Sequence, residues 1–130
     1  MQNDIQEFLD QEIWAVVGVS KDPTKFGTKV YHKLKQCGYT VYPINPKLSE
    51  LDGEPCFPSL SALPVRPDVV SLIVPPQISE QIIDQCAQLG IKRVWMQPGA
   101  ESDEALMKGR ANQMQLIAHE CVLVEARSRR

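Results

Sequence analysis

The sequence has no excess of basic residues and no long apolar run. It holds 14 Lys and Arg against 16 Asp and Glu, a formal net charge of −2, so no bulk positive field exists to hold a polyanion such as DNA. No stretch approaches the roughly 18 apolar residues of a membrane span. The N-terminus, MQNDIQEFLD, lacks the basic-then-apolar order of a signal peptide. We therefore expect a cytoplasmic protein that binds neither nucleic acid nor a membrane.

The sequence also lacks the groupings of side chains that carry metal or acid–base chemistry. Its four cysteines stand at least 19 residues apart, so we expect reduced, buried or half-buried thiols. No spacing pairs two carboxylates for acid–base work. His32 is expected to face solvent from a helix. His119 stands beside Glu120 and Cys121, but adjacent strand residues point to opposite faces, so its expected role is structural. We predict no metal site and no catalytic residue.

What the sequence does have is an alternation of strand and helix patterns. Apolar runs of strand length alternate with segments whose apolar residues recur every three or four positions. This order is typical of one α/β domain, here 1–130, with a five-stranded, mainly parallel sheet and helices on both faces. We predict strands at 12–18, 40–44, 68–74, 91–96 and 115–119, and helices at 25–37, 79–90 and 102–112.

The remaining segments have weaker patterns. Residues 1–11 predict a lead-in helix packed on one side of the sheet. Residues 47–67 hold four prolines and predict a long connection with one short helical turn near 59–63. Residues 125–130 are expected to form an exposed tail. Within the predicted helices, Phe26 is expected on the buried face, and Ser79 is expected to cap the start of its helix.

Glycine, proline, asparagine and lysine gather at the ends of the predicted strands. In an open α/β sheet, ligands bind beyond the carboxyl ends of the strands, near the point where strand order reverses. Such residues suit close approach of a ligand to the backbone, and they equally suit tight turns from strand to helix. The selected segments are Gly18-Val19-Ser20, Asn45-Pro46-Lys47, Val74-Pro75-Pro76 and Gln97-Pro98-Gly99.

The first of these segments favours a phosphate. Gly18 has no Cβ, and Ser20 offers a hydroxyl where the next helix begins, an end that carries partial positive charge. Lys21 and Lys25 add cations in the loop, although a solvated lysine face would explain part of this cluster. The dinucleotide fingerprint fails, because it needs glycine at Ser20 and at Pro23 as well as at Gly18.

The segment after the second strand argues against NAD. Nicotinamide dehydrogenases place Asp or Glu at this end to bind the ribose 2′-hydroxyl. Here the segment is Asn45-Pro46-Lys47, which is neutral to basic. The positive charge of Lys47 would favour a ribose that carries a phosphate group.

A series of motifs runs through nearly the whole chain, from about Ile13 to Glu125. In this order and spacing they resemble the small stand-alone CoA-binding proteins, whose Rossmann-like fold is similar to the N-terminal domain of the succinyl-CoA ligase α subunit. The motifs are Val16-Val-Gly-Val-Ser20, Lys25-Phe-Gly27, Gly38-Tyr-Thr-Val-Tyr-Pro-Ile-Asn-Pro46, Cys56-Phe-Pro-Ser59, Asp68-Val-Val70, Val94-Trp-Met-Gln-Pro-Gly99 and Cys121-x-x-x-Glu125.

The resemblance implies that the chain binds CoA or acyl-CoA, as a ligand, through its adenosine-phosphate end. Three groups of residues would contact different parts of the ligand. They are Gly18, Val19 and Ser20, with Lys25 and Gly27 at the start of the helix, for the pyrophosphate; Asn45, Pro46 and Lys47 for the adenosine or its 3′-phosphate; and Pro75, Pro76 and Gln97 for the pantetheine arm.

Three functions stay open at this stage. The leading one is non-catalytic binding of CoA, because the ligase α subunit carries its phosphorylated histidine in a second domain that this sequence does not match. An NAD(P)-type oxidoreductase is the second, with Tyr42 or His119 as the candidates for the proton donor. The third is a ligand-sensing module, whose protein partner the sequence does not identify.

Overall fold

Five strands form the central sheet of the computed structural model, which describes residues 2–127. All of them run parallel, in the order β2-β1-β5-β6-β7. The prediction of a single α/β domain with a five-stranded parallel sheet is confirmed. The strands are β1 (Ile13–Val17), β2 (Thr40–Ile44), β5 (Val69–Leu72), β6 (Arg93–Met96) and β7 (Gln115–Ala118).

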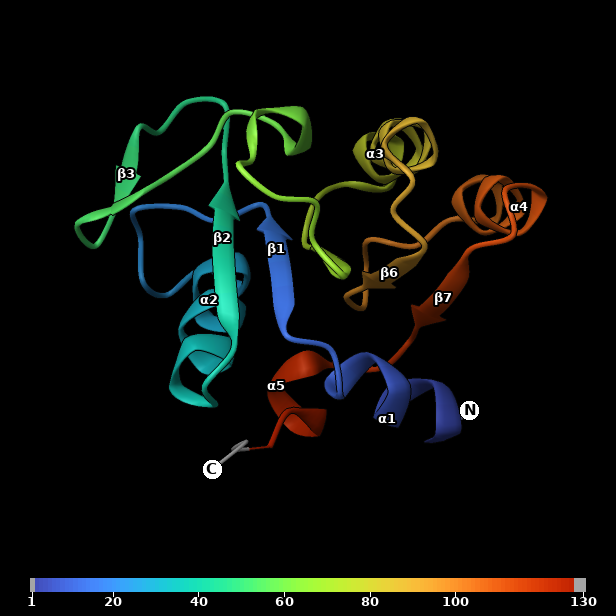
Figure 1. Cartoon of the computed structure of the whole chain (residues 1–130), viewed down its shortest axis with the longest axis horizontal. Helices are drawn as coiled ribbons and strands as arrows, with labels where there is room; N and C mark the ends of the chain where they lie inside the picture. Colours follow the sequence, from blue (N-terminus) through green and yellow to red (C-terminus); the bar gives the residue numbers. More distant parts are fainter. Residues whose placement is uncertain (1, 128–130) are drawn as a thin grey trace.

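Helices cover both faces of this sheet (Figure 1). One face packs under α1, α2 and α5, around Trp14 and Trp95, whose ring centroids lie 6.0 Å apart. The other face packs under α3, α4 and a short 3₁₀ helix, η1. Adjacent strand residues serve opposite faces, as Val69 and Val70 do in β5. The helices are α1 (Gln2–Leu9), α2 (Phe26–Gln36), α3 (Pro76–Leu89), α4 (Asp103–Ala111), α5 (Val122–Glu125) and η1 (Leu60–Ala62).

The strand order reverses between β1 and β5. From β1 the chain passes through α2 to β2 on one side, and it then returns to place β5 on the other side of β1. Doubly wound sheets bind ligands beyond the carboxyl ends of the two strands that flank this switch point. The segments that follow β1 and β5 therefore occupy the position where a ligand is expected.

The long connection after β2 holds a small hairpin that was not predicted. Its strands are β3 (Glu50–Leu51) and β4 (Glu54–Pro55), joined through Asp52 and Gly53, which have φ angles of +51° and +81°. Strands of two residues are too short to show a period of two, so no pattern in the sequence marks them. The predicted helical turn near 59–63 is confirmed as η1.

Two predictions inside the helices are wrong. Phe26 is 59% exposed, because it is the first residue of α2 and lies beyond the part of the helix that packs on the sheet, whereas Val30 and Leu34 are buried. Ser79 does not cap its helix, because α3 already begins at Pro76, a residue whose fixed φ suits the first helical position. Ser79 is instead fully buried.

The prediction for the N-terminal end is confirmed, whereas that for the C-terminal end is partly wrong. The lead-in helix is confirmed, and its Phe8 is fully buried. At the other end the exposed tail is wrong for Ala126, which is 2% exposed and donates its N–H to Val122, while Arg127 is exposed. The rest of that predicted tail, 128–130, lies outside the described residues. Within 2–127, no helix is long and apolar enough to cross a membrane.

Candidate functional site

The turn after β1 is packed tightly between β5 and α2. Gly18 has φ +112°, and a Cβ there would lie 2.1 Å from the carbonyl oxygen of Ile73. A Cβ on Gly27 would lie 2.1 Å from the carbonyl oxygen of Gly18. Both glycines therefore allow three backbone segments to meet. The sequence suggested that a ligand would occupy the space left by the missing Cβ of Gly18. That space is instead filled by the backbone of Ile73.

Thr28 fixes the backbone of Ser20 from both sides. Ser20 donates its N–H to Thr28 Oγ1 at 3.0 Å, and Thr28 Oγ1 donates to the Ser20 carbonyl oxygen at 2.7 Å. The Ser20 hydroxyl accepts from the N–H of Asp22 at 3.1 Å, which leaves its proton available for a ligand. Sequence reasoning missed Thr28, although a hydroxyl residue in the first turn of the helix was a signal. Val19 is 1% exposed, so its side chain belongs to the core.

Asn45 joins the turn after β1 to the turn after β2. Its Nδ2 donates to the Val19 carbonyl oxygen at 2.7 Å, and its Oδ1 accepts from the N–H of Lys47 at 2.7 Å. Pro46 and Lys47 are exposed beside it. The structure thus brings together the predicted residues that follow β1, begin α2 and follow β2, and Asn45 joins the two turns through its hydrogen bonds.

The ends of β5 and β6 form an open hollow of about 310 Å³. Pro75, Gln97 and Gly99 are among its lining residues, and Pro76 follows as the first residue of α3. The side chain of Gln97 is directed toward α5. Its Oε1 accepts from the N–H of Val122 at 2.7 Å, and the residue is 2% exposed. Gln97 therefore shapes the hollow, while its side-chain amide anchors α5.

The helices that begin beside the switch point lack capping side chains. Neither Lys25, before α2, nor Pro75, before α3, caps its helix, and neither first turn holds an acid. By contrast, Ser102 caps α4 by accepting from the N–H of Ala105, and two acids follow it. The positive end of the α2 dipole is therefore left uncompensated at the switch point. Pro76 has no N–H, so α3 offers fewer donors.

Exposed cations surround the start of α2. Lys21 and Lys25 lie in the loop before the helix, and Lys47 follows β2. The carboxylate of Asp22 accepts from the hydroxyl of Thr24 at 2.7 Å and from its N–H at 2.9 Å. These hydrogen bonds lower the pKa of Asp22, so it stays ionised at neutral pH. Three lysines against one carboxylate leave this part of the edge positive.

The remaining titratable groups do not gather into a cluster. Within the described residues, no three His, Cys, Asp or Glu side chains could hold a metal ion together. All four cysteines are free; Cys121 is half-buried and the other three are buried. Burial raises the pKa of Cys86 to about 12. His32 was expected to face solvent, but it is half-buried, with Nε2 2.5 Å from Asp52 Oδ2 of the hairpin.

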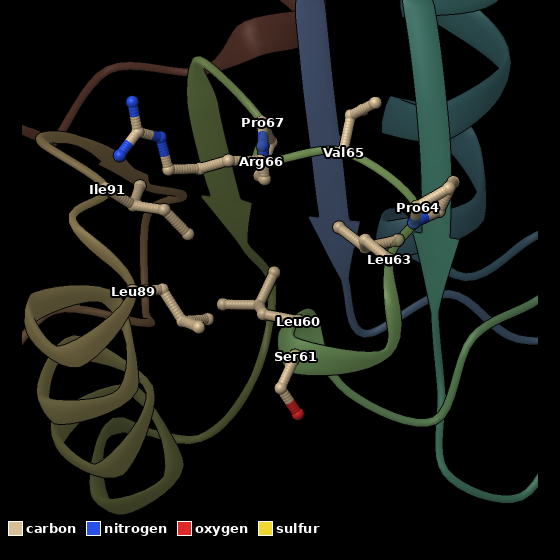
Figure 2. A pocket seen from close by; sticks show the side chains of 9 residues that line it. All are labelled: Leu60, Ser61, Leu63, Pro64, Val65, Arg66, Pro67, Leu89 and Ile91. Atoms are coloured by element: carbon tan, nitrogen blue, oxygen red, sulfur yellow. The ribbon is translucent and has the colours of Figure 1, made fainter.

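A different pocket lies at the opposite edge of the sheet. Figure 2 shows Leu60 and Leu89 pointing toward one another across it, from η1 and from the end of α3. Its lining also includes Pro67 and Ile91, which precede β5 and β6, so the pocket is at the amino-terminal ends of the strands. Its volume is about 160 Å³, and Arg66 is the charged residue that lines it. None of the predicted site residues lines this pocket.

Comparison with known proteins decides the family. Residues 12–127 match the profile of the family described as CoA binding domain. The chain belongs to this family. The α subunit of the ADP-forming acetate–CoA ligase II of Pyrococcus furiosus is 35% identical over 81 residues, which cover 62% of this chain and 18% of the subunit. This CoA-binding chain spans less than a fifth of the curated ligases that it matches.

Solved structures agree with this assignment. A hypothetical protein from Pyrococcus horikoshii OT3 has a TM-score of 0.91 and 33% identity, with 96% of this chain and 89% of that chain covered. The dinucleotide-forming acetyl-coenzyme A synthetase 1 of Ca. Korarchaeum cryptofilum, in complex with phosphate and ADP, has a TM-score of 0.73 and 32% identity. There the match covers 88% of this chain and 27% of that chain. The resemblance to small CoA-binding proteins is confirmed.

Proposed function

We propose that this chain binds CoA or acyl-CoA through the adenosine-phosphate end, at the carboxyl edge of the sheet, without catalysing a reaction of its own. The observation that carries the proposal is the start of α2. Its N-terminus has no capping side chain and no acid, and it lies at the switch point beside exposed lysines. An anion is the ligand that such a helix end favours. Membership of the CoA-binding family supports CoA as that anion.

The pyrophosphate is assigned to the turn after β1 and the start of α2. Lys29 donates its N–H to the Lys25 carbonyl oxygen, so the N–H groups of residues 26–28 precede the first bond of the helix. The Ser20 hydroxyl retains its proton as a donor. Lys25 is exposed and free to approach a phosphate. In this assignment Gly18 and Gly27 hold the turn and the helix together rather than contacting the ligand.

The adenosine and the pantetheine arm are assigned to either side of this turn. Pro46 and Lys47 are exposed on the β2 side, where the ammonium group suits the 3′-phosphate of CoA and where no acid is present for the ribose of NAD. The hollow beside Pro75 and Gly99 lies on the β5 and β6 side, and it suits the neutral pantetheine arm. Asn45 and Gln97 support these two surfaces through hydrogen bonds to the backbone.

Binding without catalysis is supported by the kind of groups around the turn. The titratable side chains there are lysines and Asp22, whose lowered pKa keeps it ionised. A carboxylate that stays ionised is not suited to act as a general acid near pH 7. Incubation with acetyl-CoA should leave the thioester intact over hours, as followed by release of free thiol. Release that depends on the protein would contradict this part of the proposal.

Calorimetric titration of a charge reversal tests the site. Lys25→Glu removes a charge-assisted contact of roughly 1.5–3 kcal/mol, so the affinity for CoA should fall at least about tenfold. Added salt should reduce the difference, because exposed charges are screened over about 10 Å at 0.1 M. Lys92→Glu is the control, since Lys92 is exposed just before β6 at the opposite edge.

Other nucleotides test the identity of the ligand. Dephospho-CoA should bind more weakly than CoA if Lys47 contacts the 3′-phosphate, and Lys47→Gln should remove that difference. NAD and NADP should bind more weakly than CoA. Tighter binding of NAD than of CoA would overturn the proposal. Equal losses of CoA affinity in Lys25→Glu and Lys92→Glu would mean that the overall charge of the protein, rather than a defined site, attracts the ligand.

A further inference from the structure

One flank of α4 faces away from the rest of the molecule. Its opposite flank packs on α3, where Lys108 Nζ lies 2.8 Å from Asp84 Oδ2. Ala105 and Gly109 are buried toward the sheet. With 3.6 residues per turn, the exposed residues Asp103, Met107 and Arg110 then lie on the outer flank. Leu106 lies at the border of this flank, half-buried against the core. Figure 1 shows α4 at the end of the molecule beside β7.

The strand beside this flank is also open. Among the described residues β7 is the last strand of the sheet, and it pairs only with β6. The other outer strand, β2, is protected, because Phe57 bridges to Ile44 and because Pro43 has no N–H to offer. No proline or charged residue interrupts β7, whose sequence is QLIA.

A hollow of about 290 Å³ lies between α4 and β7. Leu106, Met114 and Leu116 give it apolar walls, and Arg110 and His119 lie among its lining residues. Just beside it, Met107 is 63% exposed, although methionine is an apolar and adaptable side chain that packs well on other apolar surfaces. The α4–β7 face, defined by these residues and Asp103, is thus an apolar surface flanked by charges.

The charges on this face are arranged so that the face complements itself. Asp103 and Arg110 stand at the two ends of α4, and the midpoint between them falls between Leu106 and Met107. A two-fold axis at this midpoint would set two α4 helices antiparallel. Asp103 of each copy would then lie opposite Arg110 of the other, and Leu106 opposite Met107. A two-fold interface requires this kind of self-complementary pattern.

We propose that a second copy of this chain docks on the α4–β7 face and forms a two-fold symmetric dimer. The apolar centre removes Met107 and the exposed part of Leu106 from water, and two Asp103–Arg110 contacts fix the antiparallel orientation. This proposal does not depend on CoA, because the face lies away from the turn after β1.

Sedimentation velocity over a range of protein concentrations tests the dimer. Met107→Glu should raise the dimer Kd by at least about tenfold, because it places a carboxylate in the apolar centre of each copy. Val124→Glu is the matched control, since Val124 on α5 is 65% exposed. It should leave the Kd unchanged. A monomer at all concentrations up to the millimolar range, or equal effects of the two variants, would overturn the proposal.

A charge exchange tests the antiparallel arrangement. Asp103→Arg alone and Arg110→Asp alone each create two like-charge contacts per dimer, so each should weaken the dimer roughly tenfold. The double variant restores both attractions and should recover most of the affinity. All three variants place unfavourable charges at the ends of α4, which can lower the stability of the fold itself. The Tm of each variant is therefore measured alongside its dimer Kd, so that a loss of stability is distinguished from a loss of dimerisation. A double variant that dimerises more weakly than either single variant would overturn the antiparallel arrangement. A stoichiometric complex with a different protein on this face would overturn the dimer.

Discussion

Gly18 and Gly53 share a positive φ but have different surroundings. A Cβ on Gly53 would meet nothing within 4 Å, whereas a Cβ on Gly18 would meet the Ile73 carbonyl at 2.1 Å. The first glycine supplies a backbone conformation in the hairpin turn. The second also supplies room for β1, α2 and β5 to meet at the switch point. At the scale of the residue, the same amino acid therefore has two different roles.

Alanine at these two glycines should separate conformation from packing. Gly53→Ala should cost about 1 kcal/mol of unfolding free energy, because the left-handed region is unfavourable for L-residues. Gly18→Ala carries a comparable backbone cost and should lose about 1–3 kcal/mol more, because the Ile73 carbonyl must move. Urea denaturation measures both values. Equal losses would mean that the backbone around Ile73 adapts freely.

At the scale of the element, one carboxylate of α1 forms hydrogen bonds with two strands of the sheet. Glu7 accepts from Gln115 Nε2 at 3.1 Å and from Arg93 Nε at 3.2 Å, and these residues begin β7 and β6. The hydrogen bond from Gln115, followed by that from Arg93, lowers the pKa of Glu7 below its ordinary value of 4.5. Phe8, the next residue, is fully buried, so the carboxylate and the ring hold the helix from two sides.

The stability that Glu7 contributes should depend on pH. Because its pKa is lower in the folded state, the unfolded chain binds the proton more readily. The contribution is therefore present above the unfolded pKa, near 4.5, and it is lost as the pH falls through the folded value. Glu7→Gln should lower the Tm at pH 7, and the difference from the wild-type protein should shrink below pH 4.5. A difference that stays constant across this range would contradict the assignment.

The elements differ in how far the sequence predicts them. Apolar runs and helical periods locate the five strands and three of the helices, because burial on two faces leaves a clear pattern. The hairpin at Asp52 escapes this reasoning because its strands are too short to show a period, and the exposure of Phe26 escapes it because this residue begins α2 beyond the packed part of the helix. The same holds for the site. Its edge follows from the strand ends. The contact of Gln97 with Val122 joins residues 25 positions apart, and that of Thr28 with Ser20 depends on how α2 packs back onto the turn.

At the scale of the whole molecule, the two edges of the sheet are unlike each other. The carboxyl edge has the start of α2, exposed lysines and an open hollow, whereas the amino edge has an apolar pocket with one arginine. The acetate–CoA ligase α subunit that this chain matches is more than five times the length of the matched region, which covers 18% of it. The common part is the CoA-binding family domain, so ligand binding is the property to measure on the whole chain.

Ligand binding should stabilise the folded chain by mass action. CoA at 100 times its Kd should add about 2.7 kcal/mol, which corresponds to a rise in Tm of roughly 10 °C for a domain of this size. NAD at the same concentration should give a smaller rise. Differential scanning fluorimetry measures both. Equal shifts for CoA and NAD would show that the edge does not select the 3′-phosphate or the pantetheine arm.

The pairing of β1 with β5 has a consequence for how the chain reaches its folded state. Asp68 donates its N–H to Ile13 at 2.8 Å and accepts from the N–H of Ile13 through its carboxylate at 3.0 Å, across 55 positions of sequence. The unit of β1, α2 and β2 can form through shorter-range contacts. The pairing of β1 with β5 at the centre of the sheet requires the chain between Ile13 and Asp68 to close into a loop. The seam between the two halves of the protein is therefore expected to be the slow step of folding. The turn after β1 lies on this seam, where Gly18 meets the carbonyl of Ile73. We therefore expect this turn to reach its folded conformation only once the two halves have joined.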